Sequence, residues 1–225
     1  MKNKLLLLIT LSLLSCQGKN KVVSKVTVII DTVYYSNTKI ISEISTKLKN
    51  KNKMYNHGFY KSFFKNGNLE SKLYFKNGEQ LYSCYIYNSK GDLLQYSSFY
   101  KDKPFFICEY SENKDIVKTY GSILNRSIES SNDKNFVLTN ESTEYIFFFS
   151  NIPNYIFSLD SVVLNGKKIN NYSYSKCFED FHLKIKFTEI GVNKIFIYCS
   201  SKSKVIGNPS FEGFLELNEF AVKFL

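Results

Sequence analysis

The chain has 225 residues and a formal net charge of +10, yet only one of its 30 basic residues, Arg126, is an arginine. Proteins that grip phosphates favour arginine, whose planar guanidinium makes bidentate contacts, so this lysine excess argues against a nucleic acid as the partner. With 44% hydrophobic and 16% aromatic residues the chain can bury a large core, which excludes disorder throughout. The abundance of Phe and Tyr favours strands over helices, and we therefore predict an all-β fold.

The first fifteen residues have the features of a secretion signal. Lys2 and Lys4 make a short positive region, and a largely apolar run of ten residues, 5–14, follows it. Ten helical residues extend about 15 Å, half of the roughly 30 Å hydrocarbon core of a membrane. The run therefore predicts a cleaved signal peptide over residues 1–15 rather than a transmembrane anchor.

The end of this segment, Leu13-Leu14-Ser15-Cys16, resembles the lipobox of bacterial lipoproteins. In that family the cysteine thiol is diacylated, and the cysteine then becomes the new N-terminus and is acylated again. The resemblance implies that Cys16 anchors the mature chain in a lipid bilayer through a tether over residues 16–25. Each buried CH₂ of an acyl chain contributes about 0.8 kcal/mol, so several chains make a stable anchor. The alternative is an ordinary signal peptide with an incidental cysteine.

The tether and the composition suggest where the protein lies. Composition and anchor together resemble lipoproteins of the Bacteroidetes, whose surface-exported members carry acidic residues just after the cysteine. Residues 17–21 contain two lysines and no acid. We therefore expect a cell-envelope location at the outer membrane, with the periplasmic face favoured over the surface.

Residues 26–124 contain a degenerate internal repeat. Four segments share an aromatic strand end, a polar turn and a hydrophobic strand start, which is the pattern of a β-hairpin. They are residues 34–40, 63–69, 86–93 with one insertion, and 110–116. Their starts lie 29, 23 and 24 residues apart, and second hairpins such as residues 74–79 lie between them, so each repeat predicts two strands.

The best copies resemble the bacterial MORN-variant repeat, which has an H-G-aromatic opening followed by two N-G turns. The matching residues are His57, Gly58, Asn66, Gly67, Asn77, Gly78 and Gly91. The match covers residues 56–93 well and the flanks poorly. It implies an elongated, single-layer meandering sheet used for protein contacts, and some members are antitoxins that neutralise a toxin by binding. Such a sheet buries its aromatic side chains only against neighbouring hairpins, so its ends need caps.

Residues 125–225 have no repeat and predict a compact second domain. Seven short strands are expected, over residues 135–139, 144–150, 156–164, 181–188, 194–199, 211–217 and 220–225. This number in about 100 residues is typical of an immunoglobulin-like β-sandwich. Asn165-Gly166 predicts a two-residue hairpin turn. Phe181, Leu183 and Ile185 lie at alternate positions, which indicates a strand with one buried face.

Charge separates the two halves. Residues 22–124 contain 15 lysines and 9 acids, whereas residues 125–225 contain 11 basic and 11 acidic residues. Lys47, Lys49, Lys51 and Lys53 alternate where the repeat spacing is longest. They predict an insertion loop that is either simply solvated or in contact with a membrane or an acidic partner.

Candidate catalytic and metal-binding residues are sparse. His57 belongs to the repeat opening and His182 to the polar side of a strand, so both predict structural or surface roles. The carboxylate pairs Glu109/Glu112, Glu141/Glu144 and Glu179/Asp180 are expected at the solvated surface. There is no serine elbow, P-loop or dinucleotide glycine pattern, and we expect no catalytic residue, metal or cofactor.

Four cysteines follow Cys16. Cys84 and Cys108 occupy equivalent repeat positions, two strands apart, which is about 10 Å and too far for a disulfide. We predict buried free thiols at both. A hairpin near residues 190–191 would place Cys199 opposite His182, so a bridge from Cys177 to Cys199 requires the chain to bend back.

These features together predict a non-enzymatic lipoprotein of the cell envelope that binds or scaffolds an unknown protein partner. Two alternatives stay open. One is an immunity protein that neutralises a toxin by binding, and the other is a surface lipoprotein that captures glycans.

Overall fold

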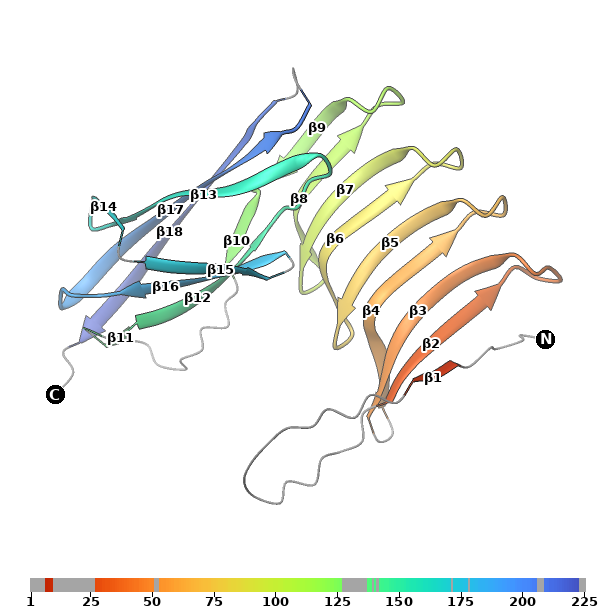
Figure 1. Ribbon diagram of the computed structural model, residues 1–225, viewed down its shortest axis with the longest axis horizontal. Coiled ribbons are helices and arrows are strands. Elements are labelled where there is room, and N and C mark those ends of the chain that lie inside the picture. The colour runs from red at the N-terminus through yellow and green to blue at the C-terminus, as the bar shows by residue number, and fades with distance from the viewer. Residues whose placement is uncertain are drawn as a thin grey trace.

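The computed structural model describes residues 7–9, 27–50, 53–126, 137–138, 140, 142–170, 172–177, 179–205 and 209–222. Within these residues all regular secondary structure is β, in three sheets, so the all-β prediction is confirmed. A long sheet forms one part of the molecule, and a smaller two-sheet unit lies at its C-terminal end (Figure 1).

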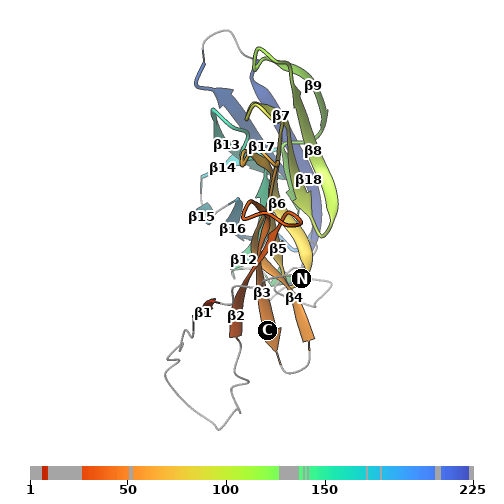
Figure 2. The same cartoon turned by 90° about the vertical axis from the view of Figure 1, so that its right-hand side faces the viewer.

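The long sheet is a meander in which each strand pairs antiparallel with the one before it. Its strands are β1 (Leu7–Ile9), β2 (Thr27–Tyr34), β3 (Ile41–Asn50), β4 (Lys53–Phe63), β5 (Leu69–Lys76), β6 (Glu79–Tyr87), β7 (Leu93–Tyr100), β8 (Lys103–Tyr110) and β9 (Ile116–Gly121). β1 lies inside the predicted signal peptide. Viewed from the side, β2 to β5 form a single layer (Figure 2).

The turns at one edge of this sheet tie each repeat to the next. The N–H of Gly78 donates to the carbonyl oxygen of Asn56 at 2.8 Å, and the N–H of Asn77 donates to Nδ1 of His57 at 3.3 Å. Asn77 and Gly78 both have positive φ, as a two-residue hairpin requires. His57 therefore has the structural role expected of it.

The turns at the opposite edge are tied in the same way. The side-chain amides of Asn66 and Asn68 both donate to the carbonyl oxygen of Ser89, at 2.7 and 2.8 Å. Gly67 and Gly91 have positive φ at equivalent places in these two turns. These contacts between turns hold a sheet that has no second layer against β2 to β5 in the described part of the chain.

The turn geometry corrects the alignment of the repeats. Three turns close with the same backbone bond between residues four apart: Phe64 to Asn68, Asn88 to Asp92 and Ser111 to Asp115. The first turn, between Tyr35 and Ile40, is one residue longer. Tyr87 and not Ile86 is thus equivalent to Phe63, since both follow a register shift in their strands. The insertion expected in the third copy lies in the first.

The lysine-rich stretch is not a loop, which corrects that expectation. Lys47 and Lys49 lie in β3 and Lys53 begins β4, so the added residues lengthen two paired strands. Nζ of Lys47 forms an ion pair with Asp31 at 2.8 Å, which fixes this lysine to the neighbouring strand. Lys49 and Lys53 are exposed, and Lys51 lies outside the described residues.

The second unit consists of two sheets. Their strands are β10 (Leu124–Arg126), β12 (Ser142–Phe149), β16 (Asp180–Lys186) and β15 (Tyr172–Cys177) in one, and β11 (Val137–Leu138), β18 (Phe211–Val222), β17 (Gly191–Ser203), β13 (Tyr155–Leu164) and β14 (Lys167–Ile169) in the other, in spatial order. They bury one shared core from facing strands. Its members include Tyr145, Phe147, Phe149, Val162, Phe181, Leu183, Ile185, Ile195, Ile197 and Leu217.

Several details of this unit were predicted and others were not. The alternation of β16 and the Asn165-Gly166 hairpin are confirmed. The expected hairpin between residues 181–188 and 194–199 is wrong, because β16 and β17 belong to different sheets and residues 187–190 cross between them. The two last expected strands are one, β18, since residues 218–219 stay paired with β17. β10, β14 and β15 were missed.

Candidate functional site

One end of the two-sheet unit packs on the long sheet at β6 to β8. The shared core continues there into Tyr96, Phe106 and Cys108, which are at most 2% exposed. Phe106 contacts Phe211 with ring centroids 5.7 Å apart. The face of the long sheet that receives this contact also carries Phe59, Lys72, Tyr74 and Tyr85, and we call it the pocket face.

Tyr82 of β6 contacts the two-sheet unit and has a left-handed backbone conformation. Its φ is +65°, and it occupies the repeat position of Gly58, whose φ is +100°. A left-handed conformation costs a non-glycine residue about 1–2 kcal/mol. Tyr82 in return packs on Phe148, with centroids 5.7 Å apart, and its hydroxyl donates to Oδ2 of Asp180 at 3.0 Å. Loss of the repeat glycine was the only sequence signal of this contact.

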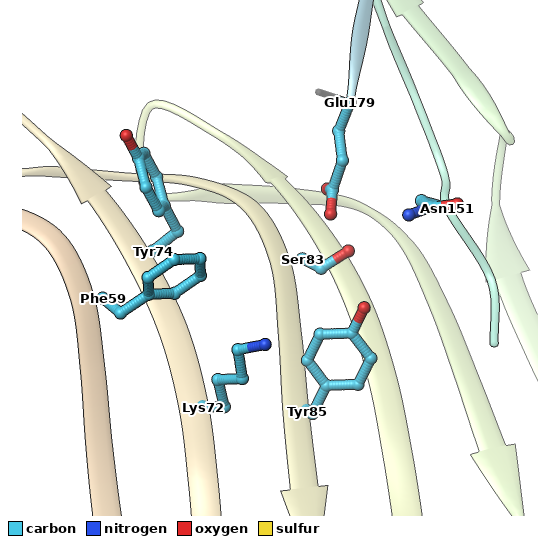
Figure 3. A pocket seen from close by; sticks show the side chains of 7 residues that line it. All are labelled: Phe59, Lys72, Tyr74, Ser83, Tyr85, Asn151 and Glu179. Atoms are coloured by element: carbon cyan, nitrogen blue, oxygen red, sulfur yellow. The ribbon is translucent and has the colours of Figure 1, made fainter. Parts of the chain in front are cut away.

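A small pocket lies beside this contact, between the two units (Figure 3). Its volume is about 190 Å³, and it is partly open to solvent. The lining residues are Phe59, Lys72, Tyr74, Ser83 and Tyr85 of the long sheet, and Asn151 and Glu179 of the two-sheet unit. The sequence-based candidates included only Glu179, and that one as a surface residue.

Glu179 is buried, which makes the expectation of a solvated Glu179/Asp180 pair wrong. The two side chains are 5% and 9% exposed, because Glu179 lies against Ser83 and Asp180 against Tyr82, both of β6. Burial raises the pKa of Glu179 to about 7, while hydrogen bonds from Ser83 and the charges of Lys72 and Lys176 oppose the rise. Its Oε2 atom has no hydrogen-bond partner among the described residues.

Lys72 supplies the opposite charge from the floor of the pocket. Its Nζ lies 4.9 Å from the ring centroid of Phe59 and 5.7 Å from that of Tyr85, so the ammonium covers both ring faces. Lys72 acts on the pKa of Glu179, yet the two side chains form no ion pair in the part of the chain that the structure describes. Figure 3 shows both groups directed into the same space.

A chain of hydroxyl groups runs from Glu179 into the core. The Ser83 hydroxyl lies 3.0 Å from the Tyr96 hydroxyl, which lies 2.9 Å from the hydroxyl of Ser98. All three residues are buried, and burial holds the pKa of Tyr96 well above its usual value. Since each hydroxyl can both donate and accept, this chain can follow the protonation of Glu179 by reversing its donors.

His182 belongs to a second cluster of polar side chains, on β12 and β16 of the two-sheet unit. Its Nδ1 lies 3.1 Å from Oε1 of Glu144, and its Nε2 lies 3.9 Å from Oδ1 of Asp180. Lys184 is 3.9 Å from the same Glu144 oxygen. His182 is 32% exposed, so it lies on the outer side of its strand as expected, but within an ion-pair group. No cluster suited to a metal ion occurs among the described residues.

The cysteines bear out the prediction of free thiols in the repeats. Cys84 and Cys108 are free and buried, in β6 and β8, with β7 between them. Cys199 is also free, and it faces Leu159 and Gly213 rather than His182. Burial raises the pKa of Cys84 to about 11 and that of Cys199 to about 12, so these thiols are poor nucleophiles.

The remaining candidates lie elsewhere. Cys16 and the side chain of Cys177 fall outside the described residues, and so does Glu141. Lys47 and Lys49 lie in β3 and Lys53 begins β4, and these strands precede the junction strands β6 to β8 in the sheet (Figure 1). Among the described residues, no helix is long and apolar enough to cross a membrane.

Comparison with known proteins adds no relative. No protein family matches the chain, and no curated protein is significantly similar to it. The chemistry of the site therefore rests on its own residues: a carboxylate oxygen for which the described residues supply no donor, an ammonium group and three aromatic rings.

Proposed function

We propose that the protein is a lipid-anchored, non-enzymatic binding protein of the cell envelope, which holds a partner protein on its repeat sheet. The lipobox-like sequence ending in Cys16 supports the anchor. Two β units that share one core support a rigid binding platform.

The family resemblances enter the proposal at the level of each unit. A nine-strand meander with N-G turns agrees with a MORN-variant sheet. The spatial orders β10-β12-β16-β15 and β11-β18-β17-β13-β14 agree with the A-B-E-D and G-F-C orders of immunoglobulin-like domains. We assign the C-terminal unit to that class on this correspondence of order, with β12, β13, β16, β17 and β18 as strands B, C, E, F and G.

The observation that carries the binding proposal is a row of aromatic rings. It starts at Phe148 in the two-sheet unit and continues through Tyr82 and Tyr74 to Phe59, with centroid distances of 5.7, 5.3 and 5.2 Å. Phe59 ends the row and is 40% exposed, in the middle of a strand. Aromatic side chains, Phe included, are enriched in protein interfaces, where a few buried anchors supply most of the binding energy.

The charge around Phe59 indicates the chemistry of the partner. Lys61 and Lys72 lie on the same face, because side chains of a strand alternate and the two residues are register partners. The N-terminal half carries the lysine excess of the mature chain. An acidic protein surface is the complement of this face.

Site-specific photo-crosslinking tests the proposal. A photoreactive phenylalanine analogue at position 59 is expected to give one discrete adduct in cells. The matched control is position 86, because Ile86 is 36% exposed on the opposite face of the sheet, one strand beyond β5. Phe59→Ala is expected to weaken co-purification of the captured partner at least tenfold. Equal adducts at both positions, or none at 59, would refute the proposed surface.

The anchor requires a separate test. Metabolic labelling with a palmitate analogue is expected to tag the wild-type chain and to miss a Cys16→Ala variant, which should leave the membrane fraction. A Cys16→Ala chain that stays labelled and membrane-bound would contradict lipidation at Cys16.

A further inference from the structure

The pocket at the junction contains two opposite charges that do not neutralise each other directly. Glu179 Oε2 is enclosed and has no hydrogen-bond donor among the residues that the structure describes, and a buried carboxylate oxygen in that state is unfavourable. Lys72 rests on aromatic rings rather than on a carboxylate. Glu179 accepts hydrogen bonds from Ser83 but has room for an ionic partner, and Lys72 has no carboxylate partner among the described residues.

The arrangement excludes several classes of small ligand. A sugar ring stacks on an aromatic face, but the Lys72 ammonium already covers the faces of Phe59 and Tyr85. A simple cation would meet the positive charges of Lys72 and Lys176, both of which act on Glu179. A simple anion would meet the Glu179 carboxylate. A molecule with one charge of each sign satisfies both groups at once.

We propose that this pocket binds a small zwitterion of the α-amino acid class, with its ammonium group on Glu179 and its carboxylate on Lys72. The apolar side chain of the ligand would lie against Tyr74. A volume of about 190 Å³ is below the range of about 300–1,000 Å³ usual for drug-sized ligands, so the ligand has to be of single amino acid size. The pocket shares Phe59 and Lys72 with the proposed partner surface, but its ligand is a different molecule from the partner protein.

Binding of an ammonium requires the ionised carboxylate. The charged and titratable groups that face Glu179 are Lys72 on β5, Tyr85 on β6, Tyr96 on β7 and Lys176 on β15. Because the pKa of Glu179 is about 7, its ionised fraction falls from one half at pH 7 to about one hundredth at pH 5. Affinity for the zwitterion should therefore fall roughly fiftyfold over that interval.

Calorimetric titration of the full-length protein in detergent tests the inference. The probes are the protein amino acids in L and D forms, with L-leucine compared with 3-methylbutylamine and 4-methylpentanoate, which each keep one charge. At least one amino acid is expected to bind, and its single-charge analogues at least tenfold more weakly. Glucose is the neutral control. No heat from any amino acid at 10 mM, or an amine that binds as tightly as its amino acid, would overturn the proposal.

Variants locate the binding. Glu179→Gln and Lys72→Met are each expected to weaken binding of the best amino acid at least tenfold, and Ile86→Ala on the opposite face should leave it unchanged. Circular dichroism of each variant establishes that it is folded. Unchanged affinity in folded Glu179→Gln would overturn the site. Failure here leaves the crosslink at position 59 untouched, so the two proposals can be separated.

Discussion

The long sheet and the two-sheet unit bury their side chains to different extents. All eight residues of β2 are half-buried, because a single layer covers its side chains only with their neighbours. In β16 buried and more accessible residues alternate, since one face meets a second sheet and the other meets solvent. Full burial in the long sheet occurs mainly in β6 to β8, where the second unit lies against it. The two-sheet unit therefore supplies the burial that the repeat sheet cannot supply by itself. The candidate pocket lies where the two units meet.

Truncating one phenylalanine in each region gives the largest expected contrast. Phe147→Ala removes a fully buried ring of the shared core and should lower the free energy of unfolding by about 3–5 kcal/mol. Phe75→Ala removes a half-buried ring of the long sheet and should lower it by about 1–2 kcal/mol. Urea denaturation measures both. Equal losses would contradict the distinction between the two regions.

Two glycines of the long sheet test whether the backbone is packed more tightly at the end near the junction. Both Gly121 and Gly67 have positive φ, but a Cβ at Gly121 would lie 2.0 Å from the carbonyl oxygen of Phe105, whereas one at Gly67 has no atom within 4 Å. Gly121→Ala should cost about 3 kcal/mol from strain and overpacking, and Gly67→Ala about 1 kcal/mol from strain. Thermal unfolding compares them, and a more harmful Gly67→Ala would reverse the interpretation.

The buried carboxyl at the boundary makes stability depend on pH. The pKa of Glu179 is about 7 when folded and about 4.5 when unfolded, so between these values the folded state binds the extra proton. The contribution of protonated Glu179 to the free energy of unfolding is therefore fully present below about pH 4.5. It is lost as pH rises through 7, and the loss reaches about 3 kcal/mol at pH 8. Glu179→Gln should abolish this loss and stabilise the protein at pH 8.

The pH experiment has a matched control in Glu212→Gln, a substitution of an exposed glutamate of β18. Denaturation at pH 5 and pH 8 is expected to give the same pH dependence for this variant as for the wild-type chain. A Glu179→Gln variant that kept the wild-type pH dependence would show that Glu179 is not its source.

Thiol labelling perturbs the protein least and compares the local unfolding of the two regions. In a background with Cys16→Ser and Cys177→Ser, the raised pKa values of Cys84 and Cys199 should slow their labelling at pH 8 at least about a hundredfold relative to the unfolded chain. With increasing urea, Cys84 of the long sheet should react before Cys199 of the two-sheet unit. The reverse order, found by mass spectrometry of labelled peptides, would contradict the comparison.

The success of the sequence predictions follows the range of the interactions involved. The Asn77-Gly78 and Asn165-Gly166 turns were predictable because positive φ at adjacent residues is a local requirement. The alternation around Leu183 was predictable because a strand has a period of two. The false hairpin between β16 and β17 arose because sequence proximity does not say which sheet a strand joins.

The candidate site was almost entirely hidden from the sequence. Glu179 lies in a polar turn that resembles a solvated one, and only its contact with Ser83, 96 residues away in the chain, buries it. Tyr82 was predictable as an aromatic strand residue, but not as the residue that reaches Asp180 through a left-handed backbone. Lys72 looked like any repeat lysine until the opposing unit placed Glu179 above it.

The amino-acid sequence by itself determined that this chain forms strands, where many of its turns lie and which half carries the lysine excess. These properties depend on backbone preferences, side-chain alternation and counting of charges. Only the tertiary structure decided that the second unit covers β6 to β8 and closes a pocket over Lys72 and Glu179. Desolvation of a charge depends on what packs over it, and that packing brings together segments that are separated by about a hundred residues.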